Sequence, residues 1–251
     1  MGLLLTLIVG LFILVGTVIG RLFKNNSKIL DFSICMSFGV IVTLSILELL
    51  PEIMESIVEG QVIRGTIFAL LCTILGFILL YQLDALIPHH EDENHTHHHK
   101  HSNCHNEHLK HIGIVTSIAL ILHNIIEGMG IYITTNTELT TGLLLCIGVG
   151  LHNLPMGFMI ESTLRNEYKF KKIVIISLLV SLATFLGGLI ALLMTTSELL
   201  MGLLLATTLG MLIYIAFIEL LPQITNMTNK KVKYIGVLSG VLILIISLIF
   251  G

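Results

Sequence analysis

Apolar residues recur along this chain in long runs, and polar residues gather in the short stretches between them. A helix that crosses a bilayer needs about 20 mostly apolar residues. Eight stretches meet this requirement, so we expect an all-α membrane protein with eight transmembrane helices in a single transmembrane domain over residues 1–251. The expected spans cover residues 2–20, 29–50, 62–87, 112–134, 141–163, 172–195, 199–221 and 231–250.

Composition supports a membrane protein. Hydrophobic residues make up 55% of the chain and charged residues only 12%. Soluble domains are usually about 25% charged, and a soluble protein of this composition would aggregate. The lipid bilayer is therefore the first expected partner, and no nucleic acid is expected. The first span lacks a basic segment before its apolar core, so we expect it to be retained and not removed as a signal peptide.

Lysine and arginine occupy alternate connections between the expected spans. The positive-inside rule places such connections in the cytoplasm, so both termini are expected on the extracytoplasmic side. Arg64 is the single exception, just inside the third span. The other basic residues lie at positions 21, 24 and 28, at 100 and 110, at 165, 169, 171 and 172, and at 230, 231 and 233.

Two distant spans end in the same motif. Residues 39–53 and 210–224 share a glycine, the group Glu-Leu-Leu-Pro and a final isoleucine in one register. In the expected topology the two copies run in opposite directions, and inverted repeats around a midplane polar site are typical of secondary transporters. Glu48 and Glu219 are therefore candidates for the entry and exit of an ion path. Alternatively, both are helix-end carboxylates that extend to the membrane surface.

A second pair of motifs places ionisable side chains in the middle of the fourth and fifth spans. His123 and Glu127 are four residues apart and so lie on one face of a helix. An imidazole or carboxylate costs several kcal/mol in hydrocarbon unless it is paired, so such groups mark functional sites. The motifs are Leu122-His123-Asn124-x-x-Glu127-Gly128 and Leu151-His152-Asn153-x-Pro155-Met156-Gly157.

The two histidines of these motifs lie at one depth. Each is about eleven residues from the start of its span, which at 1.5 Å per residue is about 16 Å into a core about 30 Å thick. Imidazole nitrogen and carboxylate oxygen suit Zn²⁺, Fe²⁺, Mn²⁺ and Co²⁺. His123, Glu127 and His152 are therefore predicted to form a midplane metal site between the fourth and fifth helices. The alternative is a buried hydrogen-bonded cluster without a metal.

At these residues the chain resembles the ZIP (Zrt/Irt-like) family of metal-ion transporters, most closely its bacterial members. The resemblance covers nearly the whole chain: eight spans, a His-rich loop, the two His-Asn motifs and the two Glu-Leu-Leu-Pro groups. It implies import of Zn²⁺ or a related divalent ion toward the cytoplasm by alternating access, in a bacterial inner membrane and often as a homodimer. The metal would be the transported substrate, no organic cofactor would be needed, and the chain would not be an enzyme.

The family carries a binuclear metal centre in its fourth and fifth spans. By resemblance, His123, Glu127 and His152 would form the first metal site. Asn124 and Asn153 would belong to the second.

Two carboxylates of the family pattern are absent from this chain. Met156 stands where the fifth span of the family carries a glutamate, and Thr184 stands where the sixth span carries another. The second site would then retain only neutral oxygens, with Thr184 as a further candidate for the ion path. We therefore expect a single metal ion, with Met156 as a soft fourth contact that favours Zn²⁺ or Cd²⁺ over Mn²⁺.

Ten of the twelve histidines lie between His89 and His111. We expect residues 88–111 to form a cytoplasmic loop that is disordered without metal, because the segment is hydrophilic and of low complexity. So dense a set of imidazoles is expected to bind metal, as a reservoir or sensor and not as a requirement for transport. The candidate ligands in the loop are His95, His97, His98, His99, His101 and His105.

Three other acidic residues, Asp31, Asp84 and Glu161, are expected to be ordinary residues of the membrane boundary. Two other functions compete with import. An exporter of the cation-diffusion type would usually have six spans and a soluble C-terminal domain. A membrane-embedded zinc hydrolase would need a catalytic water and a base beside three ligands, and the chain has no His-Glu-x-x-His motif.

Overall fold

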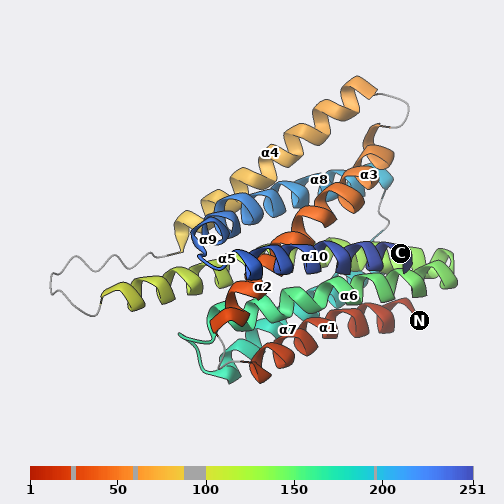
Figure 1. Cartoon of the computed structure of the whole chain (residues 1–251). Helices are drawn as coiled ribbons and strands as arrows, with labels where there is room; N and C mark the ends of the chain where they lie inside the picture. Colours follow the sequence, from red (N-terminus) through yellow and green to blue (C-terminus); the bar gives the residue numbers. More distant parts are fainter. Residues whose placement is uncertain (24–26, 59–61, 88–99, 195–196, 251) are drawn as a thin grey trace.

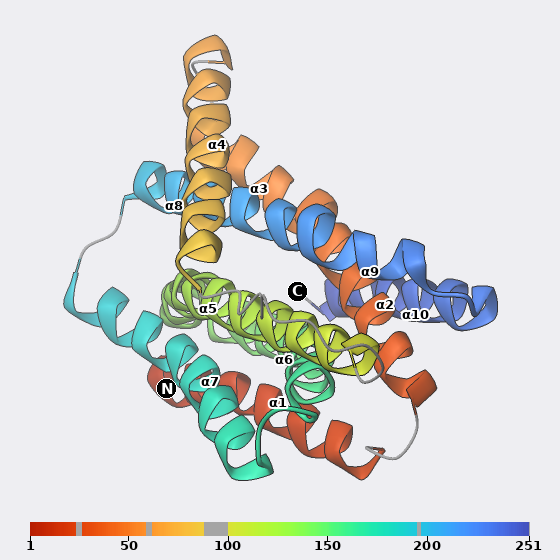
Figure 2. The same cartoon turned by 90° about the vertical axis from the view of Figure 1, so that its left-hand side faces the viewer.

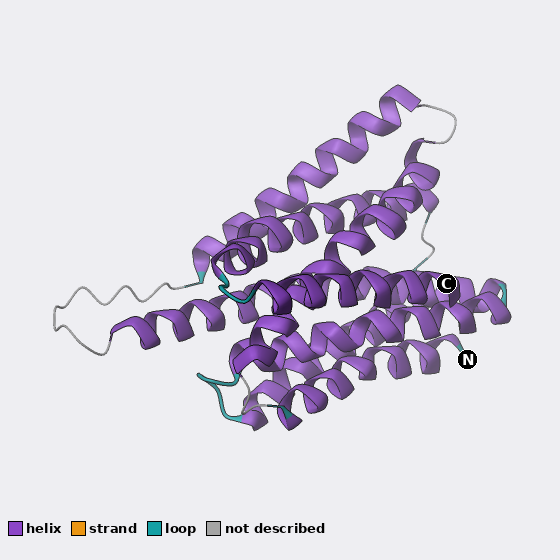
Figure 3. Ribbon diagram, viewed as in Figure 1, coloured by secondary structure: helices purple, strands orange, loops and turns teal. Residues whose placement is uncertain are grey.

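The computed structural model describes residues 1–23, 27–58, 62–87, 100–194 and 197–250. Within these ranges the chain is helical and forms no strand (Figure 3), so the expected all-α class is confirmed. Its α-helices are α1 (Gly2–Leu22), α2 (Ser27–Leu44), α3 (Leu50–Ile53), α4 (Val62–Leu86), α5 (Lys100–Thr137), α6 (Leu139–Leu164), α7 (Phe170–Leu193), α8 (Glu198–Tyr214), α9 (Leu221–Asn226) and α10 (Lys230–Phe250). Three π-helical turns complete it: η1 (Ser45–Leu49), η2 (Met54–Val58) and η3 (Ile215–Leu220).

Eight continuous helical segments in the described residues are long and apolar enough to cross a bilayer, as the sequence predicts. Helices suit this setting because each satisfies its own backbone hydrogen bonds where no water can do so. The segments are Gly2–Leu22, Lys28–Ile57, Val62–Leu86, His108–Thr137, Leu139–Leu164, Phe170–Leu193, Glu198–Asn226 and Lys230–Ile249.

The second and seventh segments continue past the prolines at which the sequence predicted them to end. Proline has no N–H to donate, so an ordinary helical turn before it loses a hydrogen bond. In both segments the turn widens just before the proline. The N–H of Leu50 donates to Ser45 O, and that of Leu221 donates to Ala216 O, five residues back in each case. Glu48 and Glu219 therefore lie in π-helical turns inside long helices and not at helix ends.

The helices pack as one four-helix group and two pairs. The four-helix group comprises α1, α5, α6 and α7, which pack on one another in the lower part of Figure 2. α2 pairs with α10, and α4 pairs with α8. Both α2 and α10 also lie against α6, whereas α4 packs chiefly on α8 and η2 and stands apart at one side (Figure 1). The boundary between the four-helix group and the other helices thus runs along α5 and α6.

Each principal helix pair is joined at two glycines, one from each helix. A Cβ at either position would overlap the backbone of the partner helix, so only glycine permits the observed approach. Close approach of backbones supplies the packing contacts that hold helices together in lipid. The pairs are Gly16 and Gly157 between α1 and α6, Gly128 and Gly187 between α5 and α7, Gly39 and Gly240 between α2 and α10, and Gly76 and Gly210 between α4 and α8.

α5 begins at Lys100, well before the span expected from residue 112. Part of the segment expected to be a disordered loop is therefore helical. No glycine or proline occurs between Lys100 and Ile112, and adding residues to an existing helix costs far less than starting a new one. Residues 88–99, which include most of the candidate loop ligands, lie outside the described residues.

Candidate metal centre

α5 and α6 bring the ionisable side chains of the two His-Asn motifs together. His152 Nε2 lies 2.9 Å from Glu127 Oε1, and His123 Nε2 lies 3.5 Å from the same oxygen. One potential ligand atom from each of the three residues lies within 4.8 Å of the other two. His123 and His152 are 29 positions apart in the sequence (152 − 123). The fold nevertheless brings the two motifs together at one point.

This cluster is buried. His123 is 5% exposed and His152 1%, and the Glu127 side chain is 9% exposed. Glu127 Oε2 and His123 Nε2 are buried without a hydrogen-bond partner among the described residues. A buried polar atom left unpaired costs about 1–3 kcal/mol. A cation coordinated by this oxygen and this nitrogen would remove that cost, so the donor set fits a metal ion.

Neighbouring helices fix the positions of the two motifs. Gly128, which follows Glu127, lies directly against the backbone of Thr184 in α7. Gly157, five residues after His152, lies against the backbone of Ile13 in α1. Ser247 Oγ of α10 lies 3.5 Å from His152 Nδ1. The two ring nitrogens of His152 therefore face different partners, a carboxylate and a hydroxyl.

Pro155 lies inside α6, which nevertheless runs without a break from Leu139 to Leu164. Because the proline ring occupies the place of a helical N–H, α6 has weaker internal hydrogen bonding near His152. Ser37 of α2 donates a hydrogen bond to Pro155 O at 3.2 Å. This contact joins the helix that carries His152 to a helix outside the four-helix group.

Glu48 faces the same region from η1. Its carboxylate interacts electrostatically with His152, Glu127 and His123, and its Oε2 is buried without a hydrogen-bond partner in the described structure. The π-helical turn therefore places the first Glu-Leu-Leu-Pro carboxylate near the cluster and not at a helix end.

The amides of the two motifs, Asn124 and Asn153, are buried as well. Asn124 donates to Val180 O of α7 at 3.1 Å. Asn124 Oδ1, Asn153 Nδ2 and Thr184 Oγ1 are buried, with no hydrogen-bond partner in the part of the chain that the structure describes. All three groups are neutral. Met156 lies one turn beyond His152, is 2% exposed and forms part of the main apolar core.

A second ionisable cluster was missed by the sequence reasoning. Asp84 of α4, His111 of α5 and Glu219 of η3 also offer ligand atoms within 4.8 Å of one another. Only Glu219 was singled out from the sequence; Asp84 was expected to be an ordinary boundary residue. His111 follows a run of loop histidines, and nothing in the spacing of the three residues signals that they meet, because they come from three different helices.

Glu161, expected to be a boundary residue, has a specific partner on another helix. It is fully buried, and its carboxylate lies 3.7 Å from the guanidinium of Arg21 in α1. A carboxylate and a guanidinium at this distance form an ion pair that offsets part of the cost of burial. Glu161 thus links the ends of α1 and α6.

The fold and the cluster define a class: a membrane protein of eight long helices with a His/Glu group buried between two of them. A family model described as ZIP Zinc transporter matches residues 1–111 and 88–248, and the chain belongs to this family. The Zinc transporter ZupT of Chlorobium chlorochromatii (strain CaD3) is 29% identical over 255 residues, which are 98% of this chain and 95% of that protein.

Two further relatives also align with 98% of this chain and with 95% of their own length. The Zinc transporter ZupT of Chlorobaculum parvum is 28% identical over 255 residues, and that of Salmonella newport is 26% identical over 252 residues. The resemblance inferred from the motifs is therefore confirmed. The chain is an integral membrane protein that transports divalent metal, and the hydrolase alternative is wrong because the family consists of transporters.

Proposed function

We propose that this protein imports Zn²⁺ toward the cytoplasm by alternating access through His123, Glu127 and His152. One observation carries this proposal: α5 and α6 bring potential ligand atoms of the three residues within 4.8 Å of one another. The sequence places these residues near the bilayer midplane, where a site can be reached from either side in turn. Two imidazoles and a carboxylate are a common zinc ligand set.

The midplane site holds one ion and not two. The positions at which the family carries two further carboxylates are Met156 and Thr184 here. Asn124, Asn153 and Thr184 offer only neutral groups to a second ion. These groups would give a second divalent ion no carboxylate of its own, and a divalent charge bound by neutral groups alone is costly in a low-dielectric interior. Met156 is the soft fourth contact of the single ion.

The remaining parts of the proposal rest on the expected topology, on the histidine-rich composition of residues 88–111 and on the family resemblance. Glu48 receives the ion on the outer side and Glu219 accepts it on the cytoplasmic side. The alternation of basic connections places both termini outside an inner membrane of bacterial type. A second copy of this chain completes a homodimer. The histidines between residues 88 and 111 bind metal on the cytoplasmic side and act as a reservoir or sensor.

Uptake into proteoliposomes tests this function. The wild-type chain should accumulate Zn²⁺ down an imposed gradient, whereas Glu127→Gln, which keeps the shape but removes the carboxylate charge, should lower uptake at least 10-fold. Glu138→Gln, at the exposed start of α6, is the matched control and should transport normally. Correctly inserted wild-type protein without divalent-metal uptake would refute the proposal.

The number of midplane ions is tested separately. Anomalous scattering from metal-soaked crystals should show one ion bound by His123, Glu127 and His152. Two ions of full occupancy between α5 and α6 would contradict the single-site mechanism.

A further inference from the structure

A set of unpaired polar atoms lies in and around the His123 cluster. Asn124 and Thr184 are 0% exposed, and Asn153 and Ser181 are 1% exposed. A buried polar atom without a partner raises the free energy of the folded state, so a set of this size indicates an occupant that pairs with several of its members. The atoms without a hydrogen-bond partner in the described structure are Glu127 Oε2, Asn124 Oδ1, Asn153 Nδ2, Ser181 Oγ and Thr184 Oγ1.

α5 runs along the turn of α7 that carries Ser181 and Thr184. Asn124 of α5 donates to Val180 O, one turn before Thr184. One turn further along α5, a Cβ at Gly128 would overlap the carbonyl of Thr184. The amide of Asn124 and the two hydroxyls of α7 therefore lie at one level of the four-helix group.

α1 and α6 meet at the same level. A Cβ at Gly10 of α1 would overlap the carbonyl of Ser181 and lie 3.3 Å from Thr184 Oγ1. Asn153 lies on the stripe of α6 that faces α1, because Gly157, four residues later, packs on the backbone of α1. The unpaired atoms thus come from α5, α6 and α7 and lie where these helices pack with α1.

The hydroxyls of Ser181 and Thr184 do not make the hydrogen bond usual for a buried hydroxyl in a helix. Thr135 and Thr163 donate to the carbonyl four residues back, at 2.7 and 2.9 Å. Ser181 and Thr184 leave this bond unmade although they are as deeply buried. Their oxygens are therefore available to another partner.

The donor set suits a monovalent cation. Asn124, Ser181 and Thr184 offer neutral oxygens, and Glu127 Oε2 adds one negative charge. Hard cations prefer oxygen ligands, and neutral oxygens coordinate Na⁺ in secondary transporters. One carboxylate balances a monovalent charge fully and a divalent charge only in part. The close backbone contacts of α7 with α1 and α5 leave little room, which favours Na⁺ over the larger K⁺.

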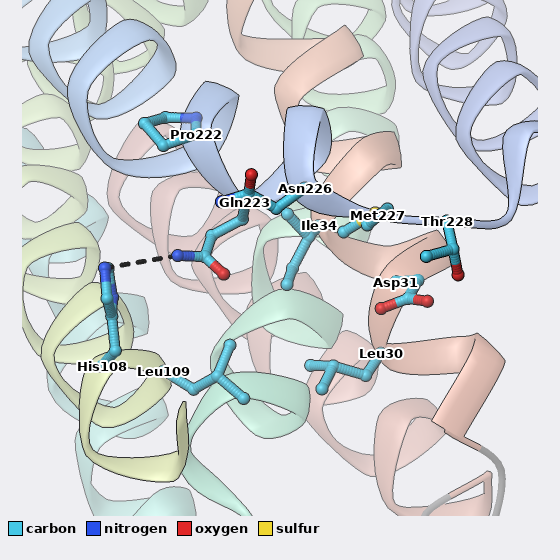
Figure 4. Close-up of a pocket in the computed structure, with 10 residues that line it drawn as sticks. All are labelled: Leu30, Asp31, Ile34, His108, Leu109, Pro222, Gln223, Asn226, Met227 and Thr228. Carbon is cyan, nitrogen blue, oxygen red and sulfur yellow. Dashed lines mark hydrogen bonds between the residues drawn. The ribbon is translucent and has the colours of Figure 1, made fainter. Parts of the chain in front are cut away.

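A pocket of about 560 Å³ between α2, α5 and α9 differs from this buried set. Asp31, His108 and Gln223 belong to its lining (Figure 4). Gln223 Nε2 lies 3.3 Å from His108 Nε2, and all three side chains keep contact with solvent. Water satisfies polar groups in an open pocket, whereas the unpaired atoms beside Glu127 are sealed between helices.

We propose that these oxygens bind Na⁺ when the His123 cluster holds no Zn²⁺. The group is called the oxygen site, and its ligand atoms are Glu127 Oε2, Asn124 Oδ1, Ser181 Oγ and Thr184 Oγ1. A half-turn of the Asn153 amide, which exchanges its nitrogen and oxygen, adds a further oxygen.

The role of this Na⁺ rests on the proposed function. Glu127 is also a ligand of the transported ion, so Na⁺ and Zn²⁺ compete for one carboxylate. Each ion then lowers the affinity of the other by the same factor. Zn²⁺ displaces Na⁺ when it enters, and Na⁺ balances the charge of Glu127 after Zn²⁺ has left.

Binding of radioactive Na⁺ to the metal-free full chain in detergent tests the oxygen site. The wild type should bind about one Na⁺ per chain, and Zn²⁺ should displace it. Ser181→Ala, which removes one ligand oxygen, should lower the Na⁺ affinity at least fivefold. Thr184→Val provides a second test if Ser181→Ala fails to fold.

Ser162→Ala is the matched control. Ser162 is 0% exposed and its hydroxyl is also unpaired in the described structure, but it lies two turns beyond Asn153 on α6. This variant should bind Na⁺ as the wild type does. Equal losses of Na⁺ affinity in Ser162→Ala and Ser181→Ala would contradict the proposed ligands.

Zinc affinity tests the competition. Replacing choline by Na⁺ at constant ionic strength should raise the Zn²⁺ dissociation constant of the wild type and of Ser162→Ala at least fivefold, the lower end of typical couplings between sites. Ser181→Ala should abolish this effect of Na⁺. K⁺ should act more weakly than Na⁺, and K⁺ that acts as strongly would contradict the assignment to the smaller ion.

The outcomes separate this inference from the proposed function. Absence of Na⁺ binding in a chain that takes up Zn²⁺ would overturn the inference alone, with water as the occupant of the oxygen site. Bound Na⁺ that Zn²⁺ does not displace would overturn the shared carboxylate. Na⁺ binding in a correctly inserted chain that transports no divalent metal would instead refute the proposed function.

Discussion

A single carboxylate oxygen organises the buried centre. Glu127 Oε1 lies within ion-pair distance of both His123 and His152. Without metal, this oxygen offsets the cost of burying two imidazoles. In the proposed metal-bound state, the same three groups would be the ligands and would need to move little. Ligands that are already gathered lose less conformational entropy on binding.

Ser247 is expected to orient His152. When Nε2 of His152 binds the metal, Nδ1 carries the proton and donates to Ser247 Oγ, which lies 3.5 Å away. Loss of such a supporting partner typically weakens metal binding 10- to 100-fold. Ser247→Ala should therefore raise the Zn²⁺ dissociation constant about 10-fold, measured by competition with a zinc-chelating dye.

Ser239→Ala is the matched control for this change. Ser239 lies on the same helix, but it is only half-buried, and its hydroxyl donates to Ile235 O of its own helix. It should bind Zn²⁺ as the wild type does. Equal affinities of the two variants would show that Ser247 does not support the ligand.

Met156 is expected to set the choice of ion. Met156→Glu would place a second carboxylate one turn from His152 in a region that is 2% exposed. Because a buried carboxylate is costly without a cation, the variant should bind more divalent charge and should favour Mn²⁺ relative to Cd²⁺. Competition uptake across Zn²⁺, Cd²⁺, Fe²⁺ and Mn²⁺ measures this shift.

Met156→Leu separates the sulfur from the packing volume. It keeps the size and apolar character of the side chain and should reduce only the preference for Cd²⁺. An unchanged ion preference and metal stoichiometry in Met156→Glu would count against the single-site interpretation.

At the scale of helices, paired glycines determine which helices pack with their backbones in close contact. Gly128 and Gly130 lie on α5 two residues apart, but only Gly128 abuts the backbone of α7; nothing lies within 4 Å of a Cβ built at Gly130. Gly128→Ala should force α5 and α7 apart and lower the unfolding temperature in detergent by several degrees. Gly130→Ala should be neutral or stabilising by up to about 1 kcal/mol, because alanine favours a helix.

These two variants carry the same chemical change, so intrinsic helix propensity cannot explain a difference between them. Thermal unfolding followed by circular dichroism provides the measurement. Equal unfolding temperatures would mean that the close approach of α5 and α7 does not limit stability.

The helices and the first cluster could be predicted from the sequence because their signals are local. Apolar runs define spans, and the spacing of His123 and Glu127 defines one face of a helix. The π-helical turns could not be predicted, because a proline usually signals the end of a helix. Asp84 was missed for a different reason: its partners, His111 and Tyr214, lie on other helices, and no periodicity links them.

For the whole molecule, the position of the two clusters along α5 is the main architectural feature. α5 belongs to the four-helix group, yet elements outside that group approach both of its ionisable clusters. Glu48 of η1 and Ser247 of α10 lie near the first, and Asp84 of α4 and Glu219 of η3 belong to the second. The helix thus carries ligands of the proposed midplane site and a histidine of the second ionisable cluster. A relative movement of the helix groups would change the surroundings of both clusters together.

The histidine-rich segment should regulate transport without being part of the ion path. Replacing the six candidate loop ligands by serine removes imidazoles at one end of α5 but leaves both buried clusters intact. The maximal uptake rate should be retained, whereas the apparent affinity for Zn²⁺ and the number of ions bound per chain should fall. Zinc uptake and metal analysis of the purified protein measure the two effects.

His123→Ala, which removes a proposed midplane ligand, should instead abolish uptake. Complete loss of uptake in a well-expressed serine variant would place the loop histidines in the transport path itself.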